Sequence, residues 1–320
     1  MNCGARVESC SDRRYARRMR RLLLVANPAA SGFTASLHRD VVEILERAFH
    51  VAAIWPNGPA QARTESAAAA ADGFDVVVAM GGDGVVHEVA NAIVGTSAAL
   101  GIIPAGTTNV FRRIAGFPRK PRQAAEILAD ATGTRALPTL TLTETTGHAT
   151  RDHIATFAAG VGFDAEVVQE SERKPLSKVG FGALHYARST TRVARTFRDR
   201  LPTLRVTDGI RTADAVAVQL QVHDHFTYFG RVPLRLGSGP KPIAAVISRL
   251  TTPRLLAGVA GAAIKRDLGR VPGIEIWEGF EKLEIASEPP AWIEADGELL
   301  GRASLFEARP EPRDLRVVAV

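Results

Sequence analysis

The chain has 320 residues, of which 46% are hydrophobic and 6% aromatic, and its formal net charge is +6. This composition predicts a globular protein with a large core and favours anionic partners, such as nucleotides or acidic lipid surfaces. Nucleic acid is the least favoured anion, because aromatic and basic residues do not alternate as they do in single-strand binders. The two cysteines, Cys3 and Cys10, exclude a disulfide framework, which is consistent with a cytoplasmic protein.

The first 19 residues are rich in arginine and predict a disordered basic tail. No apolar run in the sequence reaches the length that a transmembrane helix needs. Any association with a membrane is therefore expected to be peripheral, at its anionic inner face. The sequence leaves the oligomeric state open between a monomer and a homodimer.

Residues 20–139 alternate strand and helix patterns, which predicts an α/β domain with an open parallel, Rossmann-like sheet that binds a nucleotide. Ligands of such sheets bind at the carboxyl ends of the strands. The expected strands are 22–26, 51–55, 75–80 and 100–103, and the expected helices are 34–49, 60–71, one after residue 84 and one from about residue 110.

Residues 140–304 carry successive strand patterns, which predicts an antiparallel β-sandwich domain for the second substrate. We expect the last segment, 305–320, to return to the first domain. The expected strands are 140–144, 153–159, 203–207, 215–222, 282–286 and 292–295, with helical inserts near 178–199 and 253–268.

The most informative segment is the glycine turn that follows the strand at 75–80. It reads Gly81, Gly82, Asp83 and Gly84, and a helix pattern follows it directly. Glycines let the backbone approach a bulky anion, and the first amides of the helix point at that anion. The carboxylate of Asp83 favours a metal-bound phosphate over a bare one, because it would repel the anion without a cation between them.

Further turns carry polar residues at 27–32, at 104–109 and at the Asp-Gly-Glu sequence 296–298. The turns at 27–32, 81–84 and 104–109 follow parallel strands, so we expect them to meet at one edge of the sheet. A single glycine turn has a simpler steric explanation, and Asp-Gly is also a common hairpin signal. Three polar turns at one edge together favour a binding site.

These motifs resemble the diacylglycerol kinase catalytic domain, which bacterial lipid kinases share with sphingosine and ceramide kinases. The resemblance rests on the turns at 27–32, 81–84 and 104–109 and on the sequence 296–298. The segments 160–165 and 178–186 match it as well. The glycine turn alone also occurs in NAD kinases, so an NAD kinase remains an alternative.

The resemblance implies that ATP, magnesium and a lipid alcohol such as diacylglycerol meet in a cleft between the two domains. Glu298 would accept the proton of the alcohol, while Asp83 and Asp296 would hold magnesium or organise the site. The residues that would bind the nucleotide are Asn27, Pro28, Ser31, Gly32, Gly81, Gly82, Asp83, Gly84, Glu88, Gly106, Thr107 and Asn109.

The chain departs from the family pattern at two places. Val85 replaces the usual threonine after the glycine turn, so one hydroxyl contact is lost. The stretch 231–245 lacks the acidic residues that hold a structural magnesium in many bacterial members, and we expect no such ion there. These departures keep a third hypothesis open, a catalytically degenerate protein that binds lipid or nucleotide.

A basic amphipathic segment offers a hypothesis for membrane docking. Arg188, Arg192 and Arg195 fall at helical spacing, and Val193 and Phe197 add apolar bulk. Such a helix can lie on an anionic membrane. The alternative is a solvated basic face over a buried apolar face.

Overall fold

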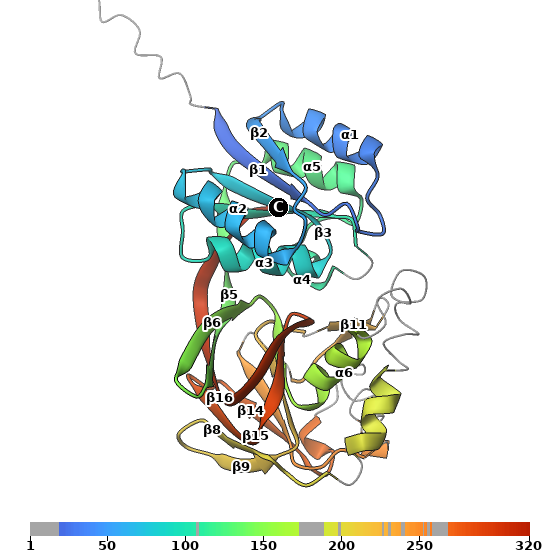
Figure 1. The fold of residues 1–320 in the computed structure, drawn as a ribbon. Helices are drawn as coiled ribbons and strands as arrows, with labels where there is room; N and C mark the ends of the chain where they lie inside the picture. The colour runs from blue at the N-terminus through green and yellow to red at the C-terminus, as the bar shows by residue number, and fades with distance from the viewer. Residues whose placement is uncertain are drawn as a thin grey trace, which may run out of the picture.

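The computed structural model describes residues 19–106, 109–172, 189–197, 200–225, 227–229, 232–237, 241–251, 253–254, 257 and 268–320. Figure 1 shows two lobes, an α/β domain above and a β domain below. The expected fold class, a parallel α/β domain followed by an antiparallel β domain, is confirmed.

The α/β domain is built on four parallel strands in the order β4-β3-β1-β2. Every residue of β3 and β4 is buried, because their continuous apolar runs face helices on both sides. The strands are β1 (Arg20–Ala26), β2 (Phe49–Ile54), β3 (Val76–Gly81) and β4 (Ala99–Pro104).

Helices cover both faces of this sheet, with α1 packed on α5 and α2 packed on α3. Thr34 caps α1, where its side-chain oxygen accepts a hydrogen bond from the amide of Leu37 at 3.1 Å. The helices are α1 (Ala35–Leu45), α2 (Pro59–Ala71), α3 (Asp83–Ile93), α4 (Val110–Ile114) and α5 (Pro121–Asp130).

The β domain consists of antiparallel pairs around a second core that contains Trp277 and Phe306. Helix α6 (Phe163–Glu172) packs on this domain. The strands are β5 (Thr134–Thr146), β6 (Ala149–Ala155), β7 (Ala158–Val161), β8 (Leu204–Thr207), β9 (Thr212–Ala215), β10 (Ala217–Gln221), β11 (Thr227–Phe229), β12 (Val232–Leu234), β13 (Ile243–Ile247), β14 (Ile274–Glu278), β15 (Leu283–Ala295) and β16 (Glu298–Val318).

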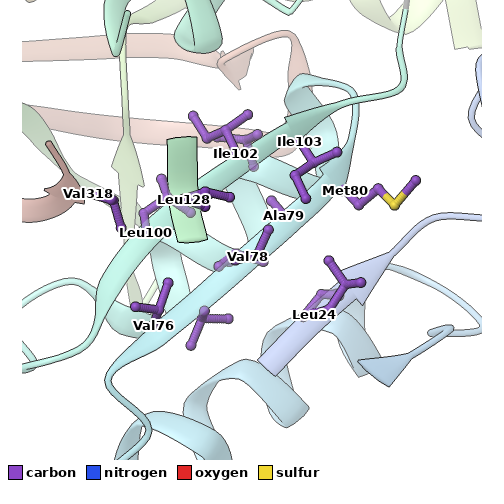
Figure 2. Close-up of a cluster of buried hydrophobic side chains, with 14 of the residues drawn as sticks. Leu24, Val76, Val78, Ala79, Met80, Leu100, Ile102, Ile103, Leu128 and Val318 are labelled. Atoms are coloured by element: carbon purple, nitrogen blue, oxygen red, sulfur yellow. The ribbon is translucent and has the colours of Figure 1, made fainter. Parts of the chain in front are cut away.

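Two long strands, β5 and β16, connect the domains (Figure 1). Near its end β16 runs beside β4, where Val317 pairs with Leu100 in parallel. Figure 2 shows Val318 of β16 and Leu128 of α5 packed with side chains of β3 and β4. The C-terminal end of the chain therefore belongs to the core of the α/β domain.

Several predicted elements were wrong in detail. The predicted strands at 282–286 and 292–295 are one strand, β15, whose pairing with β16 shifts register between Ala286 and Ala291, the stretch that contains Pro289 and Pro290. The segment 153–159 divides into β6 and β7. Helix α6 and strands β13 and β14 were not predicted, because short apolar runs give a weak periodic signal.

Candidate functional site

Backbone hydrogen bonds join the turns that follow β1, β3 and β4. The amide of Gly32 donates to the carbonyl of Ala105 at 2.8 Å, and the amides of Ala105 and Gly106 donate to the carbonyl of Gly81 at 2.9 and 3.0 Å. The amide of Asn27 donates to the carbonyl of Met80 at 2.9 Å. The structure thus brings the three turns together at the carboxyl edge of the sheet.

The turns approach so closely that glycine is required. A Cβ atom on residue 106 would lie 2.6 Å from the Cα atom of Gly82. Asn109, in the left-handed region with φ of 49°, donates from its side-chain amide to the carbonyl of Gly106 at 2.8 Å. Thr107, the remaining predicted residue of this turn, lies outside the described residues.

The β domain contributes Glu298 to the same place. Asp296 and Gly297 have φ values of 56° and 84°, which makes them the turn of the hairpin between β15 and β16. The hairpin carries the Glu298 carboxyl group to the start of α3, where a Cβ atom on Gly84 would collide with Oε1 and lie 3.3 Å from Cδ. The 296–298 sequence is therefore both a hairpin turn and a means of placing an acid at the glycine turn.

Asp83 links the glycine turn to α4. Its two carboxylate oxygens accept hydrogen bonds from the amides of Val110, at 2.9 Å, and Phe111, at 3.1 Å. The side chain of Asn109, the residue before α4, does not cap this helix. Burial raises the pKa of Asp83 to about 6, although the two amide bonds oppose the rise.

Asp296 lies in a buried network of five hydrogen bonds. Oδ2 accepts from His87 Nδ1 at 3.0 Å and from the amide and hydroxyl of Thr156 at 2.8 and 2.9 Å. Oδ1 accepts from the amides of Phe157 and Ala158 at 2.9 and 3.3 Å. Both oxygens are therefore fully used by protein donors.

Sequence reasoning missed His87 and Asn91, which lie four residues apart on α3 and face the β domain. Asn91 Nδ2 donates to the carbonyl of Ile154 at 2.9 Å, and the amide of Ile154 donates back to Oδ1 at 2.7 Å. Burial is the largest single effect on the pKa of His87 and lowers it, but the hydrogen bond to Asp296 and the nearby carboxylate charges together outweigh burial and raise the pKa. The spacing of four residues was the one sequence signal for this contact.

The other predicted residues occupy the periphery of the site. Glu88 pairs with Arg63 of α2, with Oε2 lying 2.7 Å from Nε. Pro28 and Ser31 are exposed on the first turn, and Asn27 Oδ1 accepts from the amide of Ala29 at 2.9 Å. Glu88 is thus joined to α2 and not to the three turns.

A cleft of about 1140 Å³ opens beside the turns. One side is formed by Ser31, Gly32, Gly106 and Asn109, and the buried Oδ1 atom of Asn109 has no hydrogen-bond partner among the described residues. The described lining takes in the turns after β1 and β4 but includes neither residues 81–84 nor Glu298. The cations along its other side are Arg112, Arg113, Arg119, Lys120 and Arg122.

The segment considered for membrane docking is only partly described, because Arg188 lies outside the described residues. Residues 189–197 are helical, and Val193 and Phe197 are buried against Phe163 of α6. Arg192 forms an ion pair with Glu170 of α6. These contacts favour the alternative of a basic face over a buried apolar one.

The described part of the chain contains neither a helix suited to span a membrane nor a ready-made cluster of metal ligands. No helix there combines the length and apolar character that a membrane crossing requires. No group of three or more His, Cys, Asp or Glu side chains there is arranged to hold a metal ion.

The two-domain fold with the three joined turns is the fold of diacylglycerol kinases and NAD kinases. A putative diacylglycerol kinase from Bacillus anthracis superposes with a TM-score of 0.72 at 19% identity, covering 97% of this chain and 99% of that one. An NAD kinase from Archaeoglobus fulgidus in complex with ATP gives a TM-score of 0.52 at 12% identity, covering 93% of each chain. At these identities the likeness shows the fold alone.

Residues 21–138 match the family model of the diacylglycerol kinase catalytic domain. A diacylglycerol kinase of Mycobacterium tuberculosis is 45% identical over 106 residues, which is 32% of this chain and 31% of that protein. The chain thus matches about a third of that relative. A probable lipid kinase of Pseudomonas putida, described as YegS-like, is 29% identical over 83% of this chain and 84% of its own length.

Proposed function

We propose that the protein is an ATP-dependent lipid kinase that phosphorylates the hydroxyl group of diacylglycerol or a related long-chain alcohol. One observation carries this proposal, the approach of Glu298 to Gly84. It puts an acid from the β domain at the start of α3, where free helix amides and the positive end of the helix dipole favour a phosphate.

Phosphoryl transfer requires positioning, charge neutralisation and a group that receives the proton of the alcohol. The alcohol oxygen forms a bond to the γ-phosphorus, the bond between that phosphorus and the bridging oxygen of ADP breaks, and the proton passes to the Glu298 carboxylate. Glu298 suits this role better than Asp296, because both Asp296 oxygens already accept hydrogen bonds in a buried network.

The nucleotide extends from the glycine turn into the adjoining cleft. The cleft volume of about 1140 Å³ is ample for a nucleotide, whose sites commonly measure about 300–1,000 Å³. Arg119 and Lys120 lie at the N-terminus of α5, so their positive charges and the positive end of the helix dipole both attract phosphate. Asn109 Oδ1 offers an acceptor to a hydroxyl or amino group of the ligand.

The residues fit magnesium only in part. Asp296 does not fit as a direct ligand, because five protein donors occupy its oxygens. Asp83 accepts one hydrogen bond on each oxygen and keeps further lone pairs that a metal ion could use. Magnesium in kinases is bound by one or two carboxylates together with the phosphates, where it neutralises their charge. We therefore assign Asp296 to organising the site and Asp83 to the metal-bound nucleotide.

The test is incubation with γ-labelled ATP, magnesium and vesicles that contain diacylglycerol, followed by chloroform extraction. A labelled, chloroform-soluble product supports the lipid kinase, and its formation should fall sharply in Glu298→Gln. Labelled NADP from a parallel reaction with NAD would support an NAD kinase instead. ATP binding with neither product would support a degenerate binding protein.

We place the protein in the cytoplasm, at the inner face of the membrane, where a lipid substrate would be reached. The formal charge of +6 supports attraction to anionic lipid. Sedimentation with anionic and with neutral vesicles tests this placement. Equal binding to both kinds of vesicle would contradict it.

A further inference from the structure

The proposed function leaves a buried glutamate of the β domain unused. Glu294 lies on β15, two residues before Asp296, and is 1% exposed. Its Oε2 atom accepts a hydrogen bond from the amide of Gly297 at 2.9 Å. Gly297 is the residue between Asp296 and Glu298, so the glutamate carboxyl group is bonded directly to the turn that carries the proposed proton acceptor.

Gly160, on the neighbouring strand β7, leaves room for the Glu294 side chain. Gly160 of β7 pairs with Glu294 on one side and with Gln219 of β10 on the other. A Cβ atom on residue 160 would lie 2.7 Å from Glu294 Oε1 and 3.2 Å from Gln219 Oε1. Glycine at this position therefore leaves the space that the Glu294 carboxyl group fills.

Helix α6 borders the same space through Asp164. The Cβ atom of Asp164, in the first turn of α6, would lie 3.1 Å from a Cβ atom on Gly160. Burial raises the pKa of Glu294 well above its ordinary value, and the charge of Asp164 adds to the rise. A neutral glutamine is thus a close substitute for Glu294, since it keeps an oxygen for the Gly297 amide.

We propose that Glu294 is a positioning residue that fixes the 296–298 turn, and with it the direction of Glu298 toward Gly84. Gly160 and Asp164 define the place of its carboxyl group. This inference rests on the proposed function, because it assigns Glu294 to the group that receives the proton. It also gives a role to the segment 160–165, which the sequence singles out and the proposed reaction does not use.

Glu294→Ala removes the acceptor of the Gly297 amide, and Glu294→Gln keeps it. We expect Glu294→Ala to lower kcat about tenfold or more while the KM for ATP stays within about twofold, because a small misplacement of a reacting group is costly. Glu294→Gln should retain most of the activity. Glu144→Ala is the matched control, since Glu144 is also buried in the β domain but contacts His153, away from the turn.

A double-mutant cycle separates positioning from loss of folded protein. If Glu294 acts through Glu298, Glu294→Ala should lower kcat by less than about twofold in the Glu298→Gln background. Rates are normalised to the concentration of ATP-binding sites. If Glu294→Ala lowered kcat by the same factor in both backgrounds, the positioning role would be wrong, while the proposed lipid kinase activity would be unaffected.

Hydrogen exchange gives a readout that does not depend on activity. The Gly297 amide should exchange slowly in the wild type and in Glu294→Gln, and several-fold faster in Glu294→Ala. Unchanged exchange in Glu294→Ala would overturn the positioning role even if no lipid is phosphorylated. Absence of labelled lipid from the wild type would contradict the proposed function alone.

Discussion

His87 Nδ1 lies 3.0 Å from Asp296 Oδ2, and this contact joins α3 of the α/β domain to the hairpin turn of the β domain. Both side chains are almost fully buried, at 1% and 0% exposure. Because the hairpin turn continues into Glu298, this contact between the two domains also helps to determine where the proposed proton acceptor lies.

Replacing His87 should therefore destabilise the protein. In His87→Ala the buried Asp296 carboxylate loses one of its five donors, and a lost hydrogen bond to a charged group costs about 1.5–3 kcal/mol. We expect a loss in the free energy of unfolding of that order, measured by urea denaturation. His50→Ala serves as the control, because His50 is exposed on β2. Equal stability of the two variants would show that the His87–Asp296 contact contributes little.

Glu298 and Asp296 should respond differently to amide substitutions. Glu298→Gln should lower kcat by about 10²–10⁴-fold with little change in the melting temperature, since it removes a proton acceptor. Asp296→Asn should lower the melting temperature, because one amide hydrogen-bond donor would face the donors of Thr156. Kinetics and thermal denaturation of both variants check this. Full activity in Glu298→Gln would remove it as the proton acceptor.

The contact between Gly84 and Glu298 gives a prediction from the other domain. Gly84→Ala would introduce a methyl group at the position of Glu298 Oε1 and displace the carboxyl group. We expect kcat to fall about tenfold or more with the fold retained, because alanine is favourable in a helix. Gly58→Ala is the control, since a Cβ atom there meets nothing within 4 Å. Equal kcat in the two variants would contradict the close approach.

The cationic side of the cleft should govern nucleotide affinity. Changing Arg119 and Lys120 to glutamate should raise the KM for ATP by about tenfold or more and leave kcat nearly unchanged, because the charges act on bound phosphate before the reaction. The double variant Arg205→Glu and Arg302→Glu, at exposed positions on β8 and β16, controls for the same change in net charge. A KM that rises equally in the control would indicate a general charge effect and no specific site.

The sequence predicts the α/β domain well because β1, β3 and β4 contain continuous apolar runs followed by polar turns, as at 75–84. The meeting of the three turns follows from the topology of parallel strands. The hydrogen bonds of Asp296 were not predictable, because Thr156, Phe157 and His87 are distant in sequence and carry no shared motif. The hydrogen bonds by which Asp83 caps α4 were not predictable for the same reason, because Asp83 and Val110 are 27 positions apart in the sequence.

Asp83 should make the stability of the protein depend on pH. Its pKa is raised from 3.8 in the unfolded chain to about 6 in the folded protein, mainly by burial. Between these values the folded state binds a proton that the unfolded state has lost, so the free energy of unfolding should fall as pH rises through this window and level off above it. Asp83→Asn lacks this titration. In magnesium-free buffer the wild type should therefore lose stability relative to the variant, on the order of 1–3 kcal/mol, between pH 4 and about 6. Urea denaturation at intervals of pH checks this. If the free energies of unfolding of the two proteins changed in parallel with pH, the pKa of Asp83 would not be raised in the folded protein.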